Sequence, residues 1–202
     1  GKCLSVTGVN FRYGSKGGEV EQLILPDTLQ AISGYYFGKL EKVEELTIPG
    51  SVANFSCTLQ NSDCLEKLTF SEGVEELSAN MMVANCGSLK EIVLPSTLKS
   101  ISQPGAFSGA SALETINLPD GVEFGENVGS AFSDCSSLTS ITLPASVTTI
   151  HSSMFKGCDS LTSITAKGDI ESIGSSAFSG CKALTEVALQ GKLTSVGDSA
   201  FQ

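Results

Sequence analysis

The chain has 202 residues, of which 41% are hydrophobic and 17% charged, and its formal net charge is −10. This balance is typical of a folded protein rather than a disordered one, and the surplus of acidic residues argues against nucleic-acid binding, which depends on Lys and Arg. No run of about 18 apolar residues occurs, so no segment is expected to insert into a membrane.

Residues 1–19 are expected to form a half-coil that caps the N-terminal end of a repeat array. Val6 and Val9 fall where the second apolar pair of a preceding coil would lie, and Phe11 and Tyr13 continue an alternating pattern typical of a short strand. Repeat arrays need such a cap because an end coil otherwise exposes apolar side chains and backbone groups to water.

Residues 20–202 repeat one pattern with a period near 23 residues, which predicts a solenoid of about eight coils, the last one incomplete. Consecutive coils start 22 to 25 residues apart, each with an apolar residue. No coil can bury its apolar side alone, so stacked coils are expected to share one core. The starts are Val20, Val43, Leu65, Leu89, Leu113, Leu138, Leu161 and Leu184.

The stretch LTSITLP at 138–144 shows how a coil begins. Ile141 and Leu143 alternate with Ser140 and Thr142, which predicts a short strand with its apolar residues inward. Proline follows this strand directly in five coils and turns the chain out of the sheet, because its backbone nitrogen has no hydrogen to donate. Stacked in register, the strands form a parallel sheet, and the crossovers predict a right-handed coil.

A second apolar pair, nine and twelve residues after each start, predicts a short extended or turn segment on the far wall. Only the coil that starts at Leu113 breaks this pair, with Val122 in place but Gly125 where the second member belongs. Each coil then reaches a Phe position flanked by Ser and Gly, which predicts a turn or a single helical turn. Length differences fall between the second pair and this position, so extra residues such as 126–128 are expected to bulge from one face. The Phe position reads Phe37, Leu59, Val83, Phe107, Phe132, Phe155, Phe178 and Phe201.

The motif LTSITLPASVTTIHSSMFKGC, repeated as LKEIVLPSTLKSISQPGAFSGA, resembles the BspA-like or treponemal class of leucine-rich repeats. The resemblance covers about residues 20–201. It implies a curved right-handed solenoid with a continuous parallel sheet on one face, and short strands or turns with little helix on the other. It also implies a secreted or cell-surface protein of a host-associated bacterium, in a class often described as adhesins or binding proteins. Single coils depart from the motif where Leu40, Ser62 and Ala110 replace its Cys, and where Ser71, Lys167 and Gln190 replace its Pro.

Cysteine and histidine positions favour packing over chemistry. Four cysteines share one place in their coils, and Leu40 and Ala110 fill that place in two other coils, so we expect the cysteines to pack in the core rather than bind metal. Cys57 and Cys64 lie off this column. The sequence does not decide whether they form a disulfide, because it does not give their Cα separation. His151 follows an inward residue and is expected at the surface, without a catalytic partner. The four column residues are Cys86, Cys135, Cys158 and Cys181.

No motif in the sequence predicts catalysis, a cofactor or a metal site. A single histidine must serve any triad, and no serine lies in a G-x-S-x-G elbow. Phosphate loops, dinucleotide fingerprints, zinc spacings and calcium loops do not occur in the sequence either. The chain is therefore expected to be non-enzymatic and to need no cofactor.

The outward side of the first strand in each coil forms the one wide surface that the repeat necessarily builds. We predict that this front face binds a protein partner, and the resemblance suggests a host extracellular protein; a merely solvated face is the alternative. Tyr13, Tyr35 and Tyr36 lie near the N-terminal end and are candidate aromatic anchors. The front face comprises Gln22, Ile24, Glu45, Thr47, Lys67, Thr69, Glu91, Val93, Thr115, Asn117, Ser140, Thr142, Ser163, Thr165, Glu186 and Ala188.

The leading hypothesis is a non-enzymatic binding module whose rigid surface lowers the entropic cost of association. A structural spacer or stalk within a larger surface protein is the second hypothesis. A glycan-binding module is the third, and it is disfavoured because the front face contains no aromatic residue that could stack on a sugar ring. The pattern does not indicate an oligomeric state.

Overall fold

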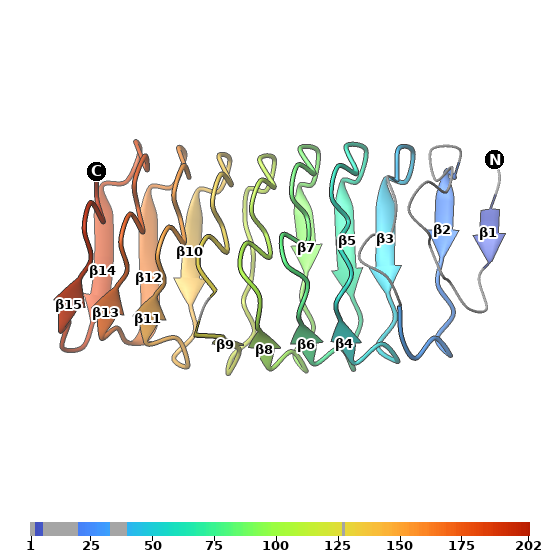
Figure 1. The fold of residues 1–202 in the computed structure, drawn as a ribbon, viewed down its shortest axis with the longest axis horizontal. Coiled ribbons are helices and arrows are strands. Elements are labelled where there is room, and N and C mark those ends of the chain that lie inside the picture. Colours follow the sequence, from blue (N-terminus) through green and yellow to red (C-terminus); the bar gives the residue numbers. More distant parts are fainter. Residues whose placement is uncertain (1–2, 6–19, 33–39, 127) are drawn as a thin grey trace.

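The structure, a computed structural model, describes residues 3–5, 20–32, 40–126 and 128–202. Short strands lie side by side along the long axis of an elongated solenoid, from β1 (Cys3–Ser5) at one end to β14 (Glu186–Gln190) and β15 (Ser195–Val196) at the other (Figure 1). Each of the strand pairings is parallel. The predicted solenoid is confirmed. No helix long and apolar enough to cross a membrane occurs in the described ranges.

The front wall consists of the first strand of each coil, as the alternating pattern predicts. In β3 (Glu45–Ile48), Leu46 and Ile48 are buried in the core, whereas Glu45 and Thr47 are exposed. Alternation therefore sends every second side chain to solvent. The other front strands are β2 (Gln22–Ile24), β5 (Lys67–Phe70), β7 (Glu91–Val93), β10 (Ser140–Leu143), β12 (Ser163–Asp169) and β14, while β1 pairs with β2.

The back wall is a second ladder, made of strands of two residues each. It forms at the second apolar pair of the coils, where neighbours such as Leu77 and Ile101 pair in register. Seven such strands mark about seven turns in the described part of the chain. They are β4 (Asn54–Phe55), β6 (Glu76–Leu77), β8 (Ser100–Ile101), β9 (Glu123–Phe124), β11 (Thr149–Ile150), β13 (Ser172–Ile173) and β15.

Proline limits the length of the front strands. β3 and β10 end directly before Pro49 and Pro144, which have no N–H group to donate to the ladder. Where Lys167 and Gln190 occupy the same place, β12 and β14 continue to Asp169 and Gln190. Proline is not the only limit, because β5 also ends at Phe70 although Ser71 replaces the proline there.

A column of aromatic rings runs through the core at the predicted period. The centroids of neighbouring rings lie 5.0 to 5.6 Å apart, and the planes are stacked. Residues with positive φ bracket the rings of Phe107, Phe132, Phe155 and Phe178, as Ser153 (φ 55°) and Gly157 (φ 72°) do around Phe155. This tight turn explains why Ser and Gly recur there. The rings belong to Phe107, Phe132, Phe155, Phe178 and Phe201.

The cysteine column lies beside the rings, as predicted, and makes a hydrogen bond that the sequence did not reveal. The Cys158 thiol donates to the backbone carbonyl of Phe132, one coil earlier, with Sγ and O 3.1 Å apart. Burial raises the pKa of the Cys135 thiol to about 12, so that thiol stays protonated and can donate. Equivalent bonds are made by Cys86, Cys135 and Cys181.

The disulfide considered between Cys57 and Cys64 does not form. Both cysteines are free, with Cys57 buried in the core and Cys64 exposed to solvent. Their side chains therefore lie in different environments although they share a coil.

The front sheet is interrupted, which corrects the continuous sheet that the family resemblance implies. It divides into β1–β2, β3–β5–β7 and β10–β12–β14. The coil that starts at Leu113 supplies no front strand, although Ile116 and Leu118 keep their inward positions and stay buried. This coil has the longest spacing to its successor, 25 residues.

The same coil also shifts the register of the back wall. Phe124, rather than Gly125, takes the second apolar position, because it pairs with Ile101 in the preceding coil. The ring of Phe124 meets that of Phe132 edge to face, with centroids 6.2 Å apart. The expected gap in the apolar pattern at Gly125 is thus filled by the preceding residue.

Candidate binding surfaces

The front face lies at the surface along the whole described length of the solenoid. All sixteen of its predicted residues are exposed or half-buried, and none is buried in the core. They form rows across the coils, because Thr47 pairs with Thr69 and Thr69 with Val93. The structure places these residues on one side of the solenoid, on three separate sheets and on the coil between β7 and β10, whereas their role in binding stays a prediction.

The two halves of the front face carry different numbers of charged residues. In the N-terminal half, Lys67 lies between Glu45 and Glu91 in one row, and its Nζ is 2.9 Å from a Glu91 carboxylate oxygen. The hydrogen bond to Glu91 and the charge of both carboxylates raise the pKa of Lys67 above its ordinary value. In the C-terminal half, the corresponding row contains the hydroxyls of Ser140 and Ser163 and then the carboxylate of Glu186.

The N-terminal end of the front face carries a shallow acidic cavity. It has a volume of about 650 Å³, and four of its seven lining residues are Glu. The candidate aromatic anchors Tyr13, Tyr35 and Tyr36, and most of the predicted cap at 1–19, lie outside the described residues. The cavity is lined by Glu21, Gln22, Glu41, Lys42, Glu44, Glu45 and Cys64.

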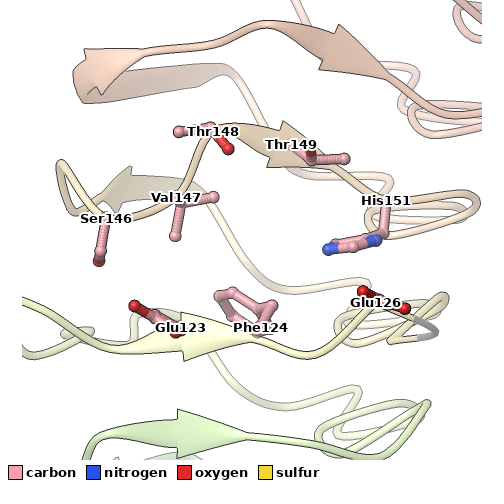
Figure 2. Close-up of a pocket in the computed structure, with 8 residues that line it drawn as sticks. All are labelled: Glu123, Phe124, Glu126, Ser146, Val147, Thr148, Thr149 and His151. Atoms are coloured by element: carbon pink, nitrogen blue, oxygen red, sulfur yellow. The ribbon is translucent and has the colours of Figure 1, made fainter.

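A second cavity lies on the back wall, where the coil of β9 meets the coil of β11. We call it the slot; it has a volume of about 480 Å³. In Figure 2, side chains from the two coils point toward one another across it, with Phe124 and Val147 near its middle. Its volume falls in the range typical of ligand sites. The slot is lined by Glu123, Phe124, Glu126, Ser146, Val147, Thr148, Thr149 and His151.

The slot is an interval in which the back-wall ladder is missing. β9 pairs with β8 but not with β11, and no Cα atom of β9 lies within 8 Å of one in β11. Both ends of the interval are closed by hydrogen bonds. At one end the Ser146 hydroxyl donates to the Val122 carbonyl (2.6 Å), and at the other the Ser130 amide donates to the Ser152 carbonyl (3.0 Å).

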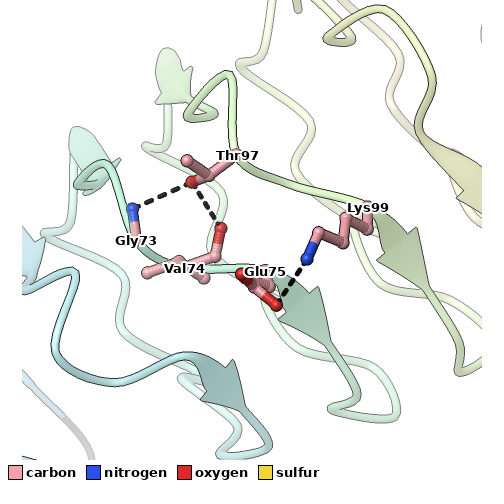
Figure 3. A network of polar contacts seen from close by, with 5 residues as sticks. All are labelled: Gly73, Val74, Glu75, Thr97 and Lys99. Atoms are coloured by element: carbon pink, nitrogen blue, oxygen red, sulfur yellow. Dashed lines mark hydrogen bonds and ion pairs between the residues drawn. The ribbon is translucent and has the colours of Figure 1, made fainter.

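The neighbouring coils show what the closed arrangement looks like (Figure 3). The Thr97 hydroxyl accepts from the Gly73 amide and donates to the Val74 carbonyl, both at 2.9 Å. Beside this turn, the Nζ of Lys99 lies 2.8 Å from a carboxylate oxygen of Glu75. The amide of Lys99 also donates to the Glu75 carbonyl at 2.8 Å, so backbone and side chains both join these two coils.

The side chains of the slot carry negative charge on one side only. Glu123 and Glu126 belong to the coil of β9, are exposed, and make no ion pair with any residue in the described ranges. His151 faces them from the coil of β11 and is half-buried. Burial lowers the pKa of His151 below its ordinary value, which favours the neutral imidazole at neutral pH.

Sequence reasoning placed His151 at a plain surface and missed the slot. The signal was present in part, since Gly125 marked the one coil that breaks the second apolar pair. Nothing in that break, however, revealed that the backbones of two coils separate. Within the described residues, no group of three or more His, Cys, Asp or Glu side chains is placed to hold a metal ion.

Comparison with known proteins supports a repeat architecture over nearly the whole chain. The family model for the BspA type leucine rich repeat region matches residues 13–128 and 105–202, with six copies. No curated protein is similar enough to count as a match.

Two solved structures resemble the chain. A leucine-rich repeat protein of T. pallidum aligns with a TM-score of 0.68 and 24% identity, over 78% of this chain and 75% of that one, and this likeness shows the fold alone. A leucine-rich cell surface protein of Faecalibacterium prausnitzii aligns with a TM-score of 0.64 and 27% identity, over 79% of this chain. The aligned part is 45% of that second protein, so the chain matches less than half of its length.

Proposed function

Because the chain belongs to the BspA-type leucine-rich repeat family, we propose that it is a non-enzymatic binding module that presents a rigid sheet face to a protein partner. The observation that carries this proposal is the set of in-register rows on the front face. Within β3–β5–β7 and within β10–β12–β14 each row is fixed by parallel pairing, and a packed core lies directly beneath it. A surface fixed in this way loses little conformational entropy when it binds.

The state of the reactive side chains supports a non-enzymatic role. Burial raises the pKa of the Cys57 and Cys86 thiols to about 11, and nucleophilic cysteines need the thiolate form. His151 lies opposite two carboxylates, and among the described residues that line the slot only Ser146 carries a serine hydroxyl or a cysteine thiol. That hydroxyl already donates to the Val122 carbonyl, so it is not activated by a base.

We also propose that the protein is displayed at a bacterial cell surface or secreted. The protein of F. prausnitzii that it resembles is described as a cell surface protein. A host extracellular protein is then the partner class that such a location offers. Fractionation of cells that produce the protein, with detection by antibody, tests the location: we expect it outside the cytoplasmic fraction.

A pull-down with a panel of purified host extracellular proteins tests the binding role. The triple variant Thr47→Ala/Thr69→Ala/Asn117→Ala should lower the affinity for a retained protein by at least about tenfold, because these three side chains belong to the front face. A matched triple variant away from that face, Ser56→Ala/Ser152→Ala/Ser175→Ala, should bind as the unmodified chain does. These control serines are exposed, so the change is comparable in size and polarity.

The same experiment separates the alternatives. No retention of any protein in the panel would favour the structural spacer. Equal losses for the two triple variants would contradict binding through the front face. Retention of glycans on an array, with no protein retained, would favour the glycan-binding module instead.

A further inference from the structure

We propose that the slot is a second binding site, which takes an extended peptide segment of a protein partner with basic side chains by adding it as a strand between β9 and β11. The site lies on the back wall, so it goes beyond the front-face proposal and does not depend on it. Three properties of the slot support this inference: its width, its backbone groups and its charge.

The width of the slot suits one additional strand. Adjacent strands in a sheet lie about 4.8 Å apart, so two strands with a third between them are roughly 9.6 Å apart. β9 and β11 are separated by more than 8 Å at every Cα pair. The hydrogen bonds that close both ends, at Ser146 and Ser130, keep the two coils from drifting further apart.

The backbone groups along the slot are those that a ladder would use. In the next coil, the amides of Glu171 and Gly174 donate to the carbonyls of Thr148 and Ile150, at 2.8 and 2.7 Å. The amides that correspond to them in register are those of Thr148 and His151. No described residue of the preceding coil accepts a backbone hydrogen bond from either amide.

The opposite side of the slot offers the matching acceptor. The carbonyl of Ile101 accepts from the Gly125 amide at 3.0 Å, and Phe124 is the register partner of Ile101. No described residue donates a backbone hydrogen bond to the Phe124 carbonyl. An extended segment between the two strands would therefore find donors on one side and an acceptor on the other, which is the arrangement used in strand addition.

The side chains select the chemistry of that segment. Phe124 is half-buried and Val147 is buried, so they provide an apolar floor for inward side chains of the segment. Glu123 and Glu126 flank the floor, and among the described residues no Lys or Arg lines the slot. Outward Lys or Arg side chains on the segment would satisfy the two carboxylates. A second copy of this chain is a poorer occupant, because its net charge of −10 would be repelled.

The test uses NMR titration of the isotopically labelled chain with defined probes. The first probe is the acetylated and amidated peptide Lys-Val-Lys-Val-Lys, which alternates basic and apolar residues. We expect chemical-shift changes concentrated at the amides of Phe124, Thr148 and His151. The titration should saturate and give a dissociation constant of about 1 mM or below. Two control probes are Glu-Val-Glu-Val-Glu, which reverses the charge, and the first peptide with both Val amides N-methylated, which removes backbone donors.

Both control probes should bind at least about tenfold more weakly if charge and strand pairing act together. The proposal is overturned if the first probe leaves these slot amides unshifted up to about 5 mM, or if the reversed-charge peptide binds as well. Equal binding of the N-methylated peptide would overturn strand addition. Chemical-shift changes confined to the front face would show that the peptide binds there, and they would overturn the slot as its site.

Surface variants complete the test without endangering the fold. Glu123→Gln/Glu126→Gln should weaken binding of the first probe about five- to tenfold, as two exposed ion pairs would. The matched control is Glu75→Gln/Glu171→Gln, which removes the same charge from exposed residues on closed parts of the back wall and should leave binding unchanged. Equal weakening by both variants would mean attraction by net charge alone and would overturn the site. All these measurements concern the back wall. The slot proposal can therefore fail while the front-face proposal stands, and the front-face proposal can fail while the slot proposal stands.

Discussion

The back wall is closed between β6 and β8 but open between β9 and β11, although both pairs of coils share the same turn and the same core. At both places a hydroxyl, from Thr97 or Ser146, donates to a carbonyl of the preceding coil. At the open place the ring of Phe132 still stacks on that of Phe155, with centroids 5.5 Å apart and planes within 5°. The comparison indicates that core packing and the turn hold the coils together, and that the back ladder can be omitted.

The largest effect is expected from breaking the feature that both places share. Phe155→Ala removes a ring that is fully buried between two others, and it should lower the free energy of unfolding by about 3 to 5 kcal/mol. Thr142→Ala, on the exposed front face, should change it by less than about 0.5 kcal/mol. Urea unfolding followed by circular dichroism measures both. Equal, small losses would contradict the shared core.

A smaller effect should distinguish the closed from the open side of one coil. On the closed side, a Cβ atom at Gly174 would meet the backbone nitrogen of Ser152. Gly174→Ala should therefore cost about 1 to 3 kcal/mol of unfolding free energy, as overpacking does. On the open side, Thr148→Ala should cost less than about 0.5 kcal/mol, because that side chain is exposed. The same urea experiment applies, and a loss at Thr148 as large as that at Gly174 would contradict an open slot.

The slot should also give the protein a small sensitivity to acid. Burial lowers the pKa of His151 below 6.5 in the folded chain, so below that pH the unfolded chain binds more protons and stability falls as the pH falls. The urea concentration at the unfolding midpoint should therefore fall more between pH 7.5 and pH 5.5 for the unmodified chain than for His151→Gln. Equal drops would show that His151 is not desolvated.

The smallest effect is expected from the ion pair that distinguishes the closed place. The side chains of Lys99 and Glu75 are 70% and 49% exposed, and exposed pairs contribute little. Lys99→Gln should therefore lower the free energy of unfolding by less than about 1 kcal/mol, measured by thermal unfolding. A larger loss would mean that side-chain charge, rather than the backbone ladder, closes this part of the wall.

Much of the fold could be predicted from the sequence because it depends on which side chains face inward. The period of about 23 residues placed Phe132, Phe155 and Phe178 in one column, and alternation placed Thr47 and Thr69 on the outside. These features follow from side-chain polarity, which a single sequence displays directly.

The slot could not be predicted because polarity does not report the distance between two backbones. The sequence marked Gly125 as irregular, but Phe124 took its place, and only the structure shows the resulting shift of one residue. The thiol hydrogen bonds, such as that from Cys158 to Phe132, stayed hidden for the same reason. The apolar character of Cys already accounted for its position, so no further signal remained in the pattern.

Native-state hydrogen exchange tests the open slot most directly, because it reports on single backbone amides. The amides of Thr148 and His151, which meet no ladder partner, should exchange at least about tenfold faster than those of Glu171 and Gly174, which donate to the preceding coil. The addition of the peptide Lys-Val-Lys-Val-Lys should slow the first two and leave the others unchanged. Equal protection of all four amides in the free chain would contradict the broken ladder, and the proposed peptide site would fall with it.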